Sequence, residues 1–271
     1  MPTTRFLFWN LNRRPLAETV AALAREQKVD VLVLIEDPTP VSTMLLSLNR
    51  DSAEFHFCRS MGAEAQIYTR FSSSFLTAVS GRDRLLISRL ALPARTEILL
   101  AVTHFPSKLH WTSDSQSYEC GELARDIMKQ EELLGHHRTV LLGDFNMNPF
   151  EHGMVAAGGL HSVMSREITK RLSRKVQGRE YPFFYNPMWG HFGDKMTKTA
   201  GSYYYDNAEH VEYFWNMFDQ VLIRPELAAQ FDPSALEIVT VAGSSSLVRR
   251  DGRPDKGSFS DHLPVRFDLS F

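Results

Sequence analysis

The feature that most constrains the fold is a series of short apolar runs with the character of buried strands. Val31-Leu-Val-Leu-Ile35 is apolar at every position, as is typical of a central strand covered on both faces by other layers. Similar strand-like runs occur at 5–9, 85–88, 98–103, 139–142, 219–223, 237–241 and 265–269. Strands therefore predominate, which predicts an α/β fold with two packed β-sheets covered by helices.

Helical signals are fewer than strand signals. Leu16, Val20 and Leu23 recur at the spacing of one helix face, and Pro15 suits a first helical turn. The clearest later helix is expected over 115–134. The 271 residues are 43% hydrophobic, which is enough for a substantial core. Because no repeat or low-complexity linker divides the chain, we expect one catalytic domain over 1–271.

Composition excludes several classes of protein. Cys58 and Cys120 are the only cysteines, so a disulfide scaffold and a four-cysteine zinc site are excluded, and a reduced intracellular setting is expected. No apolar run reaches the roughly 20 residues that span a bilayer. The N-terminus lacks the pattern of a signal peptide, so a cytoplasmic location is expected. The formal net charge is −2, so a nucleic acid would have to be bound by a local basic patch.

One region departs from the strand and helix pattern, and we expect it to form an insertion at about 165–215. Its first part, 165–179, holds one acid, Glu167, and six basic residues: Arg166, Lys170, Arg171, Arg174, Lys175 and Arg179. Such a stretch is either a solvated helix face or an arm that binds a phosphate backbone. Its second part, 181–215, is rich in aromatic residues. These rings either pack in a core or stack on unpaired bases, a lipid or a partner.

The residues that indicate chemistry lie where strand-like runs end or, for Asp261 and His262, just before the last run begins. They carry carboxylate, amide and imidazole groups: Asn10, Asn12, Glu36, His104, Asp144, Asn146, Asp261 and His262. Carboxylate and amide oxygens favour a hard cation, Mg²⁺ or Mn²⁺, over zinc. A carboxylate–metal cluster beside a histidine suits phosphoryl chemistry, because the metal neutralises phosphate charge and the imidazole stabilises or transfers a proton.

Five short blocks occur in a characteristic order. They are Trp9-Asn-x-Asn12, a strand that ends in Glu36, Gly143-Asp-Phe-Asn-x-x-Pro149, Phe218-Asp219 and Ser260-Asp-His-Leu-Pro264. Over about residues 5–269, this order resembles the endonuclease/exonuclease/phosphatase superfamily, which includes deoxyribonuclease I and exonuclease III. The resemblance implies a four-layered α/β sandwich with its site at one edge, where two mixed β-sheets meet.

The resemblance also implies roles for the acidic and amide residues. Asn10 and Glu36 would hold the divalent metal, and Asp261 would join them. Asp144 and Asn146 would position the attacking water and the phosphate.

The remaining candidates are two histidines and their neighbours. His262 would contact the scissile phosphate while Asp219 holds its ring. His104 matches a second histidine found in the deoxyribonuclease I, sphingomyelinase and inositol-phosphatase branches, whereas abasic endonucleases differ there. Asn12 and Lys108 are candidates for substrate contact.

Each candidate also has an ordinary structural alternative. Asn10 and Asn12 would otherwise shape a turn or cap a helix, and Asp144 with Asn146 would form an Asx turn before a proline. Glu36 would be a solvated strand end. His104, Asp219, Lys108 and His262 would be strand, surface or core residues.

Three functions are compatible with this pattern. The first is a metal-dependent phosphodiesterase, most simply a nuclease that acts on DNA or RNA by in-line attack of water. The second is a phosphatase or phospholipase-like esterase for inositol phosphates or sphingomyelin. The third, a non-catalytic binding module, would be expected to lack Glu36, Asp144 or His262, and all three are present. No obligate protein partner is evident.

Overall fold

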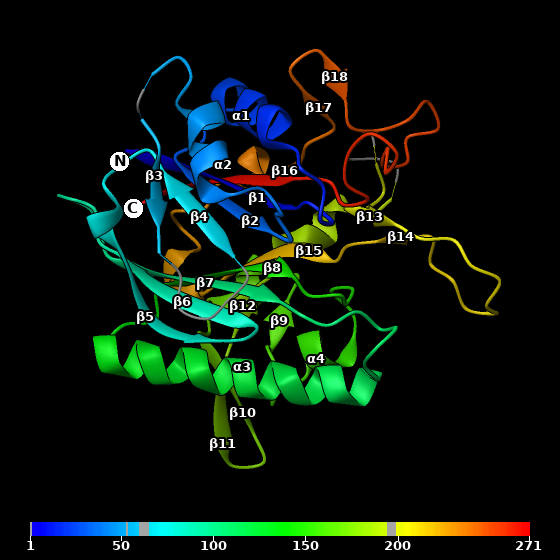
Figure 1. The fold of residues 1–271 in the computed structure, drawn as a ribbon. Helices are drawn as coiled ribbons and strands as arrows, with labels where there is room; N and C mark the ends of the chain where they lie inside the picture. The colour runs from blue at the N-terminus through cyan, green and yellow to red at the C-terminus, as the bar shows by residue number, and fades with distance from the viewer. Residues whose placement is uncertain (1, 53, 60–64, 194–198) are drawn as a thin grey trace.

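The computed structural model describes residues 2–52, 54–59, 65–193 and 199–271. Two large β-sheets stack face to face, and helices cover the outer face of each sheet (Figure 1). This arrangement confirms the predicted four-layered α/β sandwich. Among the described residues, no helix is long and apolar enough to cross a membrane.

The first sheet has six strands in the order β16-β19-β1-β2-β4-β3. Only β1 and β2 run parallel; the other neighbours are antiparallel. Helices α1 (Ala17–Glu26) and α2 (Val41–Leu48) pack together over its outer face (Figure 1). The strands are β1 (Thr3–Asn10), β2 (Val31–Ile35), β3 (His56–Cys58), β4 (Gln66–Thr69), β16 (Glu237–Ile238) and β19 (Val265–Ser270).

The second sheet has seven strands in the order β5-β6-β7-β8-β15-β12-β9. It is also mixed, since β7 with β8 and β12 with β9 are parallel pairs. Helix α3 (Ser113–Leu134) covers its outer face and packs against α4 (His152–Val155). The strands are β5 (Leu76–Arg82), β6 (Leu85–Leu90), β7 (Ile98–His104), β8 (Thr139–Asp144), β9 (Ser162–Val163), β12 (Phe184–Tyr185) and β15 (Asp219–Ile223).

The alternation of side chains along β7 explains the layers. Leu100 and Val102 belong to the core between the two sheets. Leu99 and Ala101 point to the opposite face and belong to a second core with buried residues of α3, namely Cys120, Leu123 and Ile127. A strand that is apolar on both faces is thus buried by a sheet on one side and a helix on the other.

Three two-stranded hairpins and several short helices complete the fold. The hairpin β13–β14 lies at one edge of the sandwich, whereas β10–β11 projects beyond α3 (Figure 1). The remaining elements are α5 (Arg166–Thr169), β10 (Ser173–Val176), β11 (Arg179–Pro182), β13 (Tyr203–Tyr204), β14 (Trp215–Asn216), β17 (Val241–Ala242), β18 (Ser245–Ser246), η1 (Ser73–Phe75), η2 (Pro187–His191), η3 (Pro225–Leu227) and η4 (Pro233–Ala235).

Two predictions about these elements are wrong. The strand expected over 237–241 divides into β16 and β17, because Pro264 offers no N–H to extend the ladder beyond Ile238 and Val265. The first helix begins at Ala17, so Pro15 lies just before it. By contrast, β2 and β15 have the predicted bounds.

The basic and aromatic region also differs from a simple insertion. Only α5 of the basic stretch is helical, and 173–179 belongs to the β10–β11 hairpin, so the helix-face alternative is wrong for most of the stretch. Gln177 and Gly178 both have positive φ, as a two-residue hairpin turn of this hand requires. In the aromatic part, β12 pairs with β15 and β9 and so lies inside the second sheet.

The close approach of β7 and β8 requires glycine at position 143. A Cβ there would lie 1.9 Å from the carbonyl oxygen of Thr103. We therefore expect Gly143→Ala to lower the free energy of unfolding by on the order of 3 kcal/mol, because strands must move to admit the methyl group. Urea unfolding measures this change. Gly158→Ala is the matched control, since nothing lies within 4 Å of its added Cβ; equal losses in both variants would contradict the prediction.

Candidate active site

Strand register places three candidate residues in one row at the edge of the second sheet. His104 ends β7 opposite Asp144, which ends β8. Asp219 begins β15 and also lies opposite Asp144. Register partners direct their side chains to the same face of a sheet. The three groups, widely spaced in sequence, therefore face the same region at the mouth of the sandwich.

The first sheet contributes a second group of residues to this edge. Asn10 ends β1 beside Ile35 of β2, and Glu36 is the next residue after that strand. The Asn10 Nδ2 donates a hydrogen bond of 3.0 Å to Asp144 Oδ2 and so links the two sheets. Glu36 Oε1 lies 3.3 Å from His104 Nε2. The two sheets thus meet through side chains of the predicted site.

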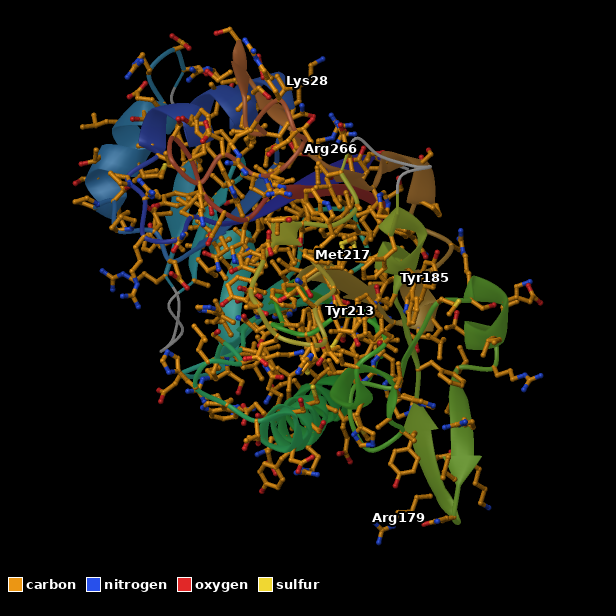
Figure 2. All side chains as sticks on the ribbon, turned by 90° about the vertical axis from the view of Figure 1, so that its right-hand side faces the viewer. Lys28, Arg179, Tyr185, Tyr213, Met217 and Arg266 are labelled. Atoms are coloured by element: carbon orange, nitrogen blue, oxygen red, sulfur yellow. The ribbon has the colours of Figure 1, made fainter. Side chains whose placement is uncertain are left out.

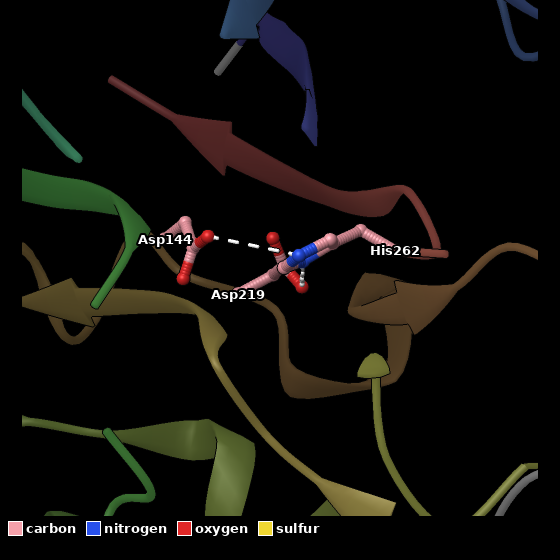
Figure 3. Close-up of side chains that lie close together, drawn as sticks. All are labelled: Asp144, Asp219 and His262. Carbon is pink, nitrogen blue, oxygen red and sulfur yellow. Dashed lines mark hydrogen bonds and ion pairs between the residues drawn. The ribbon is translucent and has the colours of Figure 1, made fainter. Parts of the chain in front are cut away.

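His262 connects the carboxylates of the row (Figure 3). Its Nδ1 lies 2.8 Å from Asp219 Oδ2, and its Nε2 lies 3.8 Å from Asp144 Oδ2. The backbone holds it firmly, because Trp9 Nε1 donates to its carbonyl oxygen and its own N–H donates to Ser260 Oγ. Asp219 therefore fixes the ring so that the second nitrogen faces Asp144.

The charge of His262 depends on this environment. Burial alone would lower its pKa, but the nearby carboxylates of Asp219 and Asp144 outweigh burial and raise the pKa to about 10. A histidine between two buried carboxylates is favoured as imidazolium, because the positive charge is paired on both sides. With Asp219 bound to Nδ1, the Nε2–H is the proton that faces Asp144.

A cavity of about 320 Å³ opens over these groups. Eight of the ten predicted site residues line it: Asn10, Asn12, Glu36, His104, Asp144, Asn146, Asp261 and His262. Asp219 lies behind the imidazole of His262 and is fully buried. The tenth, Lys108, lines an adjoining pocket, and its Nζ lies 2.6 Å from both carboxylate oxygens of Glu151.

The cavity lining fits a hard divalent cation. Glu36, Asp261 and Asn10 supply oxygen donors, as such a cation prefers. Asp261 Oδ1 is buried and has no hydrogen-bond partner in the part of the chain that the structure describes. Asp144, Asp219 and His262 also offer ligand atoms within 4.8 Å of one another. Asp219 and His262 bond each other. The carboxylates of Glu36 and Asp261 are therefore the better candidates for metal ligands.

Comparison with known proteins defines the fold. TDP2 from D. rerio, solved with a single-strand DNA product, matches at 16% identity and a TM-score of 0.58, over 100% of both chains. An endonuclease/exonuclease/phosphatase family protein from Bacteroides thetaiotaomicron matches at 12% identity and a TM-score of 0.56, over 100% of this chain and 98% of that chain. The 3′ phosphatase NExo from Neisseria, bound to a product DNA hairpin, matches at 15% identity and a TM-score of 0.54, over 99% and 100%.

These likenesses decide the architecture. The chain has the fold that these three proteins share. No family model matches the sequence, and no curated protein matches it significantly. At identities this low, the matches establish the fold alone, so the roles of the residues rest on the geometry of the cavity.

Three residues of the cavity have an unusual backbone conformation. Asn12, Glu36 and Asn146 have φ of 47°, 50° and 48°. Left-handed backbone is uncommon outside glycine and concentrates where a site needs a side chain in one position. In Asn146 it lets the backbone N–H donate to Asp144 Oδ1 at 2.8 Å. The turns after these strands therefore shape the cavity.

Several residues of the cavity are not among those predicted from the sequence. Tyr203 packs on His262 with ring centroids 4.6 Å apart, and Arg13 and His110 are also in the lining. Ser260 bonds both the Asn10 carbonyl and the His262 N–H. Tyr203 lies in an aromatic segment without periodicity, so only its tertiary contact reveals it. Ser260 could have been predicted from the sequence, because it is the first residue of the Ser-Asp-His block.

Proposed function

We propose that this protein is a divalent-metal-dependent phosphodiesterase that hydrolyses nucleic acid. One observation supports the proposal most strongly. A single cavity at the mouth of the sandwich brings Asp144 within 4.0 Å of imidazole nitrogens of both His104 and His262. The carboxylates of Glu36 and Asp261 line the same cavity. Such a set can bind a phosphate, orient water and move a proton.

The position of each side chain in the cavity indicates its role. His262 presents an imidazolium Nε2–H to a phosphate oxygen, while Asp219 acts as a positioning residue through Nδ1. Asp144 accepts hydrogen bonds from Asn10 and from the Asn146 N–H, so it is held ready to orient the attacking water. Its contacts are ordered before substrate binds, which lowers the reorganisation needed in the transition state.

His104 and the metal ligands form the other side of the cavity. Glu36 Oε1 is 3.3 Å from His104 Nε2, which places this imidazole where it can contact the phosphate or the leaving oxygen. Glu36, Asp261 and Asn10 would hold Mg²⁺ or Mn²⁺. When bound, the ion supplies neutralisation of phosphate charge and lowers the pKa of coordinated water.

The choice of nucleic acid as substrate is supported by two structural neighbours. The D. rerio protein is described with a single-strand DNA product and the Neisseria protein with a product DNA hairpin. The basic β10–β11 hairpin does not support a nucleic-acid substrate. Arg179 at the tip of this hairpin lies far from Tyr213, which is near the mouth of the sandwich (Figure 2). Contact with substrate is therefore proposed at the cavity and its rim, where Asn12 and Arg13 lie.

Cleavage of nucleic acid tests the proposal. Supercoiled plasmid, linear single-stranded DNA and RNA are incubated with the protein and Mg²⁺ or Mn²⁺, and products are resolved on gels. We expect cleavage that EDTA abolishes and that Asp144→Ala, prepared in parallel, lacks. Turnover that persists in EDTA would refute the metal dependence. Failure to cleave any of these substrates would refute the nuclease, and phosphate release from inositol phosphates would then test the phosphatase alternative.

A further inference from the structure

A second pocket adjoins the catalytic cavity. It measures about 460 Å³ and shares Ser107, Asn146 and Tyr203 with that cavity. We call it the aromatic pocket; its lining also includes Lys108, Tyr205, Glu209, Glu212, Tyr213 and Phe218. Because the two spaces share these lining residues, a substrate whose phosphate lies in the catalytic cavity can place a neighbouring group in this pocket.

Three rings in the aromatic pocket are stacked nearly parallel. Tyr203 lies 5.2 Å from Phe218 at 24° and 6.4 Å from Tyr205 at 14°, measured between ring centroids and planes. The alternation of β13 produces this row, since Tyr204 points to the other face and packs under Arg253. A parallel row offers one more planar ring a stacking surface. A cage for a quaternary ammonium group would instead surround it with converging ring faces.

The charge of the aromatic pocket disfavours a further phosphate. Glu209 and Glu212 line it, and its one lysine, Lys108, bonds both oxygens of Glu151. A second phosphate would therefore meet two carboxylates, and the lysine of the pocket lining is already paired with Glu151. A neutral ring with amino groups at its edge suits the pocket better, because a carboxylate accepts hydrogen bonds from such amines.

We propose that the aromatic pocket binds an unpaired nucleobase next to the scissile phosphate. The substrate is then a single strand or an unpaired end, since a paired base must first leave its stack to enter. This inference rests on the proposed function and specifies its substrate class. Tyr213, which is 56% exposed on the loop between β13 and β14, lines the pocket and offers its ring to the base.

Binding can be measured separately from cleavage. Fluorescence anisotropy of a labelled DNA single strand and of the same sequence in a duplex is recorded with Asp144→Ala protein, which keeps the substrate intact. We expect tighter binding of the single strand. Tyr213→Ala should weaken that binding roughly tenfold, whereas Tyr213→Phe should retain it, because stacking needs the ring alone. Tyr118→Ala is the matched control: this tyrosine is 69% exposed on α3, outside both cavities.

Three results would overturn the inference. One is equal affinity for duplex and single strand, and another is a Tyr213→Ala variant that binds like its parent or like Tyr118→Ala. The third is stronger competition by phosphocholine than by a nucleoside monophosphate, which would assign the pocket to a cationic headgroup. Each of these leaves nucleic-acid cleavage by the wild type standing, whereas loss of the proposed function would appear as no cleavage at all.

Discussion

Replacing His262 with glutamine is expected to lower kcat for phosphodiester hydrolysis by roughly 10²- to 10⁴-fold, the range for loss of a general acid or base. The imidazole Nδ1 is bonded to Asp219 at 2.8 Å, and its Nε2–H faces Asp144 across the cavity. Glutamine keeps similar bulk and hydrogen-bonding capacity but cannot carry the proton. Steady-state kinetics with a DNA substrate and Mg²⁺ measures the loss.

Two control variants separate chemistry from folding in this experiment. His161→Gln replaces another buried histidine, which packs on Phe183 outside both cavities, and we expect it to retain activity. Asp219→Asn keeps the size of the side chain but weakens the hydrogen bond that orients the His262 ring. We therefore expect kcat to fall while KM changes little. Thermal melts accompany all three variants. His262 would have a structural role if His161→Gln lost as much activity, or if His262→Gln had a much lower melting temperature.

The second large effect concerns stability. Glu131→Ala is expected to lower the free energy of unfolding by about 3–5 kcal/mol, because it leaves a buried arginine without its counter-charge. Glu131 Oε1 accepts from Arg224 Nε at 2.8 Å, and its Oε2 accepts from Nη2 at 3.1 Å. Both residues are almost completely buried. The Arg224 guanidinium also lies 3.9 Å from the ring centroid of Phe184, so it cannot turn to water without disturbing the core.

Urea unfolding with two further variants tests this explanation. Glu132→Ala changes the next residue of α3, which is exposed, and should cost little. Replacing both members of the pair, as Glu131→Leu with Arg224→Met, should recover much of the loss because no unpaired charge remains. A double variant as unstable as Glu131→Ala would show that lost packing, rather than an uncompensated charge, causes the effect.

Local sequence patterns are enough to recognise the strands that form the body of the fold. Val31–Ile35 and Asp219–Ile223 are apolar enough to be recognised without their neighbours, and the structure gives them the predicted bounds. Polar residues that end such runs were also recognisable, because rigid strands hold the residues at their ends in fixed positions. Glu36 and Asp144 end such runs, His262 precedes the last one, and all three lie around one cavity. Their catalytic roles stay predictions until variants are measured.

Which of these groups meet depends on how the strands and sheets pack. Register places His104 and Asp219 on either side of Asp144, and no local pattern encodes pairing between strands so far apart in sequence. The stacking of Tyr203 on His262 has the same origin. Sequence periodicity reports which face of a strand is buried, whereas the identity of the neighbour depends on how whole sheets pack. The aromatic pocket, built from loops and a short hairpin, was therefore visible only in the folded chain.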